Sequence, residues 1–177
     1  MMRARGLSHV GVTVSDFGRA VRFYWEVFGC PLIAVSEMPP ERVRAFFGIT
    51  DPSPTCTVGW ILLPDGGVLE LFAFEPKEPK AALQWNRPGF THVALHVNDL
   101  DRWHAHLTVH GVQCLSKPIK TPAGHRLFYA KDTDGNLIEL IDLGYRYHLL
   151  VWIGGIMSRF SRLRRFGRYY QSPPSPP

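Results

Sequence analysis

The stretch Asp134-Gly135-Asn136-Leu137-Ile138-Glu139-Leu140-Ile141 has a partial copy earlier in the chain, Asp65-Gly66-Gly67-Val68-Leu69-Glu70-Leu71-Phe72. Each copy predicts a tight turn that leads into a strand, because Asp-Gly tolerates the positive φ angles of a hairpin turn and an apolar run suits a half-buried strand. A glutamate in the middle of such a strand is unusual. Because an unpaired buried carboxylate is costly or takes up a proton, Glu70 and Glu139 each require a solvated edge, a cation or a metal.

A second repeated motif places a histidine near the start of a strand. Residues 8–17 align with residues 91–100, so that His9 corresponds to His92. The histidines are further apart along the chain than the glutamates, which predicts an insertion in the first unit, around residues 39–54. The chain is therefore organised as an internal repeat, in the order His9, Glu70, His92, Glu139.

Each repeat predicts a β-α-β-β-β unit. In the first unit, Asp16 can cap a helix that stops at Gly29, and in the second unit a helix runs from an Asp99 cap to Gly111. The expected strands lie at 7–14, 31–35, 57–63 and 68–74 in the first unit and at 91–97, 112–115, 126–130 and 137–143 in the second, with a short helix at 41–47 in the insertion. We expect an α+β fold in which the two modules form a curved mixed sheet around a metal-binding cavity.

Length and composition indicate one ordinary globular domain or two small units that share a core. We expect this domain to span residues 1–143, with module one at 7–74, a connector at 75–89 and module two at 90–143. No apolar run approaches the ~20 residues that cross a bilayer, and the N-terminus lacks a signal-peptide pattern, which predicts a cytoplasmic protein. The three cysteines are widely spaced and predict reduced thiols.

The net charge of +5 belongs to the C-terminal tail. Residues 144–177 hold six of the twenty Lys and Arg and no acid, so the rest of the chain has fourteen bases against fifteen acids. The rest of the chain therefore lacks the excess of positive charge that is typical of proteins that bind nucleic acid. The basic stretch 159–168 is compatible with an anionic membrane surface. The favoured interpretation is an extension that is partly disordered or covers the core or a second subunit.

The repeated histidines and glutamates together form a metal-ligand set. Two imidazoles and two carboxylates suit one borderline divalent cation, namely Zn, Ni, Co, Mn or Fe. With six-fold coordination, two adjacent positions stay open for substrate oxygens, and the metal can stabilise an enolate or enediolate while a loosened glutamate acts as base. We therefore predict His9, Glu70, His92 and Glu139 as the metal ligands.

The motifs Ser8-His9-Val10-Gly11, Leu69-Glu70-Leu71, Thr91-His92-Val93-Ala94 and Asp134–Glu139 resemble those of the vicinal-oxygen-chelate superfamily. That superfamily includes glyoxalase I, methylmalonyl-CoA epimerase, extradiol dioxygenases and the fosfomycin- and bleomycin-resistance proteins. The resemblance covers about residues 7–143 and is nearest to the glyoxalase I and epimerase branches. It implies paired βαβββ modules with metal ligands on the first and last strand of each, and Glu139 as the base in preference to Glu70.

Two residues depart from the pattern of bacterial glyoxalase I. Thr13 and Phe74 stand where that branch has an arginine and an asparagine that hold glutathione, so the sequence leaves open whether glutathione or CoA is involved. The epimerases in turn usually have glutamine as their second ligand, where this chain has Glu70.

Candidate substrate-binding residues lie near the predicted ligands. His96 follows His92 by two strand pleats, which puts both on one face, and it aligns with Thr13 in the first unit. His125 in a loop and Tyr129 on the following strand are weaker candidates for the rim. We expect a small-molecule substrate.

These observations favour a metal-dependent lyase or isomerase, glyoxalase I-like or epimerase-like, that acts through a metal-stabilised enediolate or enolate with glutamate as base. An Fe(II)-dependent extradiol-type dioxygenase would use two histidines and one carboxylate, and Glu70 would then occupy a position that oxygen or catecholate needs. A ligand-sequestering protein of the bleomycin-resistance type needs no metal ligands. We expect a homodimer, and the pattern fits both a site within one chain and a site exchanged between two chains.

Overall fold

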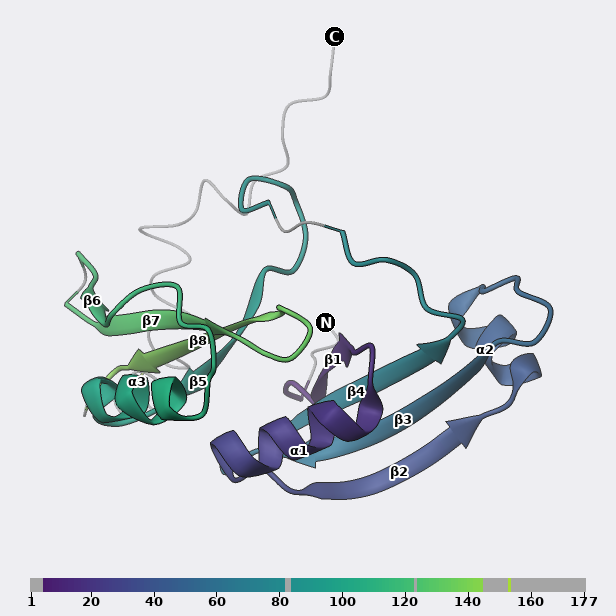
Figure 1. Cartoon of the computed structure of the whole chain (residues 1–177), viewed down its shortest axis with the longest axis horizontal. Helices are drawn as coiled ribbons and strands as arrows, with labels where there is room; N and C mark the ends of the chain where they lie inside the picture. The colour runs from purple at the N-terminus through teal and green to yellow at the C-terminus, as the bar shows by residue number, and fades with distance from the viewer. Residues whose placement is uncertain (1–4, 82–83, 123, 145–152, 154–177) are drawn as a thin grey trace, which may run out of the picture.

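The computed structural model describes residues 5–81, 84–122, 124–144 and 153. These residues form two modules (Figure 1). The first module runs β1 (His9–Thr13), α1 (Phe17–Phe28), β2 (Leu32–Met38), α2 (Pro40–Phe47), β3 (Thr55–Leu62) and β4 (Val68–Glu75). The second runs β5 (His92–His96), α3 (Leu100–Val109), β6 (Ile119–Lys120), β7 (Arg126–Lys131) and β8 (Leu137–Asp142). The α+β class with two βαβββ modules is therefore confirmed, and α2 is the predicted insertion.

Each module contains one four-stranded mixed sheet. The strand orders are β1-β4-β3-β2 and β5-β8-β7-β6. The first strand of each module runs parallel to the last one, and the other neighbours are antiparallel. Within the described residues the two sheets are separate, so β1 and β5 are each an edge strand of their own sheet rather than neighbours in one curved sheet.

Helix α1 covers one face of the first sheet (Figure 1), and it begins and ends at the residues that the sequence predicts. The Asp16 carboxylate accepts a hydrogen bond from the Arg19 backbone N–H at 2.8 Å, and Gly29 ends the helix at a positive φ of 68°. A Cβ on Gly59 of β3 would lie only 2.4 Å from the Phe17 ring, so glycine is what lets α1 approach the sheet closely. Tyr24 is one of the residues that α1 buries.

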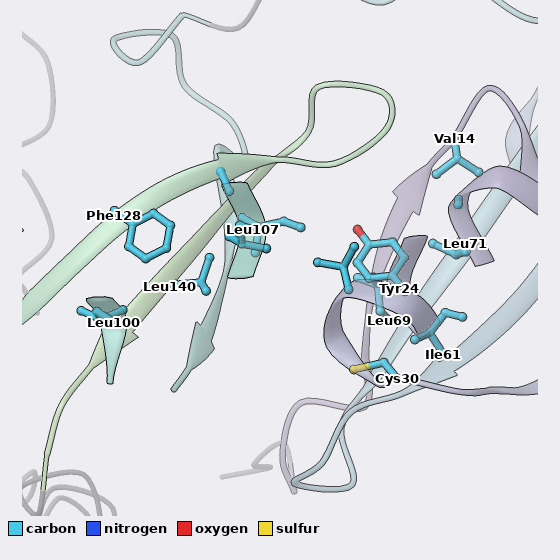
Figure 2. Packing of buried hydrophobic residues seen from close by; sticks show 14 residues of the cluster. Val14, Tyr24, Cys30, Ile61, Leu69, Leu71, Leu100, Leu107, Phe128 and Leu140 are labelled. Carbon is cyan, nitrogen blue, oxygen red and sulfur yellow. The ribbon is translucent and has the colours of Figure 1, made fainter. Parts of the chain in front are cut away.

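The two modules share one hydrophobic core (Figure 2). From the first module, Tyr24, Ile61, Leu69 and Leu71 are buried in it, and from the second module Leu100, Leu107, Phe128 and Leu140. Because side chains alternate along a strand, this core uses one face of each sheet and leaves the opposite face for the repeated histidines and glutamates.

Polar contacts at the β7–β8 turn fix the modules to each other. The buried Asp132 carboxylate lies 3.4 Å from the Tyr24 hydroxyl of α1, and burial beside Asp132 raises the pKa of Tyr24 well above its ordinary value. Asp134 contacts Arg19 at 3.2 Å, and the Lys80 ammonium donates to the Asp134 carbonyl at 2.8 Å. Module two is thus bonded to the start of α1 and to the connector.

One predicted strand is wrong. Residues 112–115 form no strand; Cys114 makes an isolated bridge to Ala130, and the two-residue β6 pairs with β7 further along the chain. Only the bonds from Lys131 N to Gln113 O and from Leu115 N to Tyr129 O flank the bridge, which is too short a ladder for a strand.

All three cysteines are free thiols. Residues 145–152 and 154–177, which carry the predicted basic tail, lie outside the described residues. Among the helices of the described part, none is both long and apolar enough to cross a membrane.

Candidate metal centre

The first half of the predicted site is a His9–Glu70 pair on the first sheet. The parallel register places His9 beside Val68, so that Glu70 lies on the same face two residues further along β4. His9 Nε2 and Glu70 Oε2 are 3.1 Å apart. The Glu70 side chain is only 14% exposed, against 42% for His9, so the carboxylate is largely removed from water while the imidazole is open to a ligand.

The second half repeats this geometry on the second sheet. His92 lies beside Leu137, and Glu139 follows two residues later along β8. His92 Nε2 and Glu139 Oε2 are 2.8 Å apart, and the Glu139 side chain is 10% exposed. The internal repeat of the sequence is therefore also a repeat of side-chain geometry.

A serine or threonine precedes each histidine, and its hydroxyl contacts Nδ1 of the imidazole, the ring nitrogen that does not face the glutamate. Ser8 Oγ is 3.2 Å from His9 Nδ1, and Thr91 Oγ1 is 2.9 Å from His92 Nδ1. These contacts hold each ring with Nε2 toward its glutamate, which is the arrangement that orients a metal-binding imidazole. Two Nε2 atoms and two carboxylates are donors that suit a borderline divalent cation.

Trp60 is a site residue that the sequence reasoning missed. It lies opposite Glu70 in the β3–β4 hairpin, and its indole N–H donates to Glu70 Oε1 at 2.8 Å. Its ring also stacks near His9, with centroids 6.4 Å apart. The signal was available in the hairpin register, since pairing outward from the Asp65-Gly66 turn brings Trp60 opposite Glu70.

Tyr129 occupies the equivalent position in module two, opposite Glu139. Its ring packs edge-on against His92 at 5.3 Å and against Trp85 of the connector at 5.2 Å. Burial, together with the neighbouring Glu139 charge, raises the pKa of Tyr129. The structure thus places Tyr129 beside the His92–Glu139 pair, and its role in binding substrate stays a prediction. Trp85 is a second neighbour that the sequence did not indicate.

The other predicted substrate-binding residues lie at different distances from the pairs. His96 is on the same face of β5 as His92, and Thr13 is on the same face of β1 as His9, as the period-two rule predicts. His125 precedes β7 at the end away from the His92 row, and its carbonyl accepts a hydrogen bond from Thr121. Among the described residues, His125 contacts neither pair, and its predicted place at the rim stays a prediction.

The two half-sites are separate within the described chain. There, no group of three or more His, Cys, Asp or Glu side chains is close enough to hold a metal ion. Both imidazoles nevertheless border one cavity of about 1030 Å³. The connector between β4 and β5 and the Asp134–Leu137 turn form much of its wall. The chain therefore presents two matched two-residue half-sites.

This fold and these paired His–Glu sites define a class of protein. A family model of the Glyoxalase/Bleomycin resistance protein/Dioxygenase superfamily matches residues 6–140, and the chain belongs to that superfamily. The uncharacterized protein YaeR of Escherichia coli K12 is 26% identical over 142 residues, which are 80% of this chain and 99% of YaeR. Lactoylglutathione lyase of Schizosaccharomyces pombe is 28% identical over 76% of this chain, which spans 46% of that enzyme.

Solved structures agree with this fold. A glyoxalase family protein from Bacillus cereus superposes with a TM-score of 0.68 at 23% identity, over 80% of this chain and 95% of that one. The fosfomycin resistance protein FosX of Listeria monocytogenes, crystallised with Mn(II) and sulfate, gives a TM-score of 0.55 at 19% identity, over 83% of this chain and 99% of FosX.

Proposed function

We propose that this protein is a metal-dependent lyase or isomerase whose site consists of His9, Glu70, His92 and Glu139 and one divalent ion of the Zn, Ni, Co, Mn or Fe class. The observation that carries the proposal is the repeated register: each histidine lies two residues before its glutamate on a neighbouring parallel strand. The similarity to a lactoylglutathione lyase supports lyase chemistry, and the similarity to FosX, which was crystallised with Mn(II), supports a bound divalent metal.

Each residue of the proposed site has a defined task. When bound, the ion polarises a substrate oxygen and stabilises the negative charge that develops there. His9 and His92 would hold the ion through Nε2, because Ser8 and Thr91 contact their Nδ1 atoms. Glu139 would take up a proton from the carbon next to the polarised carbonyl and return it to the product. The rings of Tyr129 and Trp85 lie against the His92 ring beside it.

The proposal requires two half-sites to meet. A second copy of the chain accomplishes this if His9 and Glu70 of one protomer face His92 and Glu139 of its partner, because a two-fold dimer then contains two complete sites. Strands β1 and β5 are edge strands of their sheets within the described part of the chain, which favours such an exchange. A homodimer with exchanged half-sites is accordingly part of the proposal, and closure of the modules within one chain around the shared cavity is the alternative.

Metal content of complementary variants tests both the site and the exchange. The wild-type protein should bind about one ion per chain, and His9→Ala and His92→Ala should each lose it. If half-sites are exchanged, unfolding and refolding the two variants together should restore about a quarter of the wild-type content, since half of the dimers are mixed and each mixed dimer holds one intact site. A mixture that regains nothing indicates that one chain closes its own site.

His125→Ala is the matched control, because this histidine lies outside both pairs and its loss should leave the metal content unchanged. A wild-type protein that binds none of the five ions after soaking contradicts the proposed function itself.

A further inference from the structure

His106 of α3 and His110, the residue that caps the C-terminus of this helix, form a second imidazole pair, apart from the residues of the candidate metal centre. His106 and His110 are four residues apart and therefore lie one above the other on the same helix face. Their ring centroids are 4.2 Å apart, with the planes tilted by 43°. His106 is partly buried and His110 is exposed, so the pair is open to solvent on one side.

Hydrogen bonds determine which nitrogen of each ring carries a proton. His106 Nε2 lies 2.9 Å from the carbonyl of Val27, and His110 Nδ1 lies 2.8 Å from the carbonyl of His106. A carbonyl oxygen only accepts hydrogen bonds, so both of these nitrogens must donate. In the neutral rings, His106 Nδ1 and His110 Nε2 therefore carry the free lone pairs.

This is the state in which imidazole binds a metal. A metal-binding histidine is neutral and commonly donates its remaining N–H to a backbone carbonyl, which fixes the tautomer and the ring orientation. We propose that His106 and His110 form a second metal site, which takes a borderline divalent cation such as Cu²⁺, Ni²⁺ or Zn²⁺ through two ring nitrogens, with water at the other positions.

An ion at this site would strengthen the contact between the modules. The N–H of His106 crosses from α3 to a carbonyl in the last turn of α1, and Phe28 of α1 stacks on Trp103 of α3 beside it, with centroids 5.7 Å apart. A cation on His106 Nδ1 locks the tautomer that makes this bond. Because the ion binds the folded pair, it stabilises the joined modules.

Copper titration of the full chain tests the site without reference to any activity. The His9→Ala/His92→Ala double variant serves as the parent, so that the candidate metal centre contributes no imidazole. Trp103 lies next to His106, with ring centroids 5.5 Å apart, and bound Cu²⁺ should quench its fluorescence. Adding His110→Gln should weaken the saturable quenching by about tenfold or more, since one of two ligands is lost.

His104→Gln is the matched control, because it changes a histidine of the same helix whose ring contacts Phe128 instead. It should bind Cu²⁺ like the parent, and the electron paramagnetic resonance spectrum of the Cu²⁺-loaded parent should show coupling to two nitrogens. Absence of saturable binding in the parent, or identical curves for the parent and the His110→Gln variant, overturns the proposal.

Discussion

The two modules place histidine and glutamate at the same register, but the side chains that contact the two glutamates differ. In module one, Trp60 donates to one oxygen of Glu70 while the other oxygen contacts His9. In module two, the equivalent residue is Tyr129, which packs against His92 and Trp85. Within the described residues, the polar side-chain contact of Glu139 is the one to His92.

This difference suggests a division of labour within the proposed site. A carboxylate held at both oxygens keeps its position and suits a permanent ligand, whereas a carboxylate held at one oxygen can turn toward a substrate proton. From this difference in contacts we propose Glu70 as the anchored ligand and Glu139 as the base, without using the resemblance to known families.

The largest expected effect comes from exchanging each glutamate for glutamine. At saturating metal, Glu139→Gln should lower kcat by about 10²–10⁴, the usual contribution of a general base. Glu70→Gln should mainly raise the metal concentration that is needed and lower kcat less. Turnover would be measured on whichever substrate a screen of α-oxo thiol adducts and acyl-CoA epimers identifies. Equal losses of kcat in the two variants would remove the distinction between the modules.

The same pair of variants separates a catalyst from a protein that only sequesters a ligand. In a sequestering protein, Glu139→Gln should leave ligand affinity about as it was, and no turnover should exist to be lost.

A smaller effect is expected from Trp60 and its equivalent in module two. Trp60→Phe keeps an aromatic ring near His9 but deletes the N–H that holds Glu70, so metal affinity should fall by about tenfold, in the range typical for a residue that orients a metal ligand. Tyr129→Phe keeps the ring contacts and should change metal affinity by less than about twofold. Competition with a chromophoric chelator measures both. Unchanged affinity in the Trp60→Phe variant would show that the indole does not position Glu70.

How much the sequence revealed depends on how local each feature is. The caps at Asp16 and Asp99 follow from an aspartate placed before an apolar helical pattern. The modules and the His–Glu registers follow from short repeated strand motifs with a period of two. The hydrogen bond between Trp60 and Glu70 depends on the hairpin register and on the side-chain rotamers. The sequence pattern predicts which residue lies opposite Glu70, but it does not predict the rotamers that form the bond.

The features that the sequence did not give depend on tertiary arrangement. Whether β1 and β5 join in one sheet is decided by how the modules pack, and in this chain the packing uses α1, α3 and the β7–β8 turn. Likewise, the apolar character of residues 112–115 predicts a strand, but only Cys114 finds a bridge partner. The spacing of apolar residues predicts neither outcome.

The modules also differ in packing, because α2 gives module one a small core of its own. Val43 of α2 packs there with the fully buried Cys56 and with Phe72 and Phe74 of β4. Burial raises the pKa of the Cys56 thiol from 9.0 to about 11. In module two, Cys114 is only partly buried, and burial raises its pKa as well. We therefore expect the stronger response to alkaline pH from Cys56.

The sign of this response follows from the raised pKa. Below pH 9 the thiol is protonated in both the folded and the unfolded chain, and its full contribution to stability is present; between pH 9 and 11 only the unfolded thiol ionises, so stability falls. At about 1.4 kcal/mol per pH unit, Cys56 should account for about 1.4 kcal/mol of the loss by pH 10. Urea unfolding in reductant at pH 8 and pH 10 should show a drop that Cys56→Ala reduces by this amount and Cys114→Ala by less. Because the cavity left by alanine destabilises the protein equally at both pH values, an unchanged drop in the Cys56→Ala variant would mean that the small core of module one does not keep this thiol neutral.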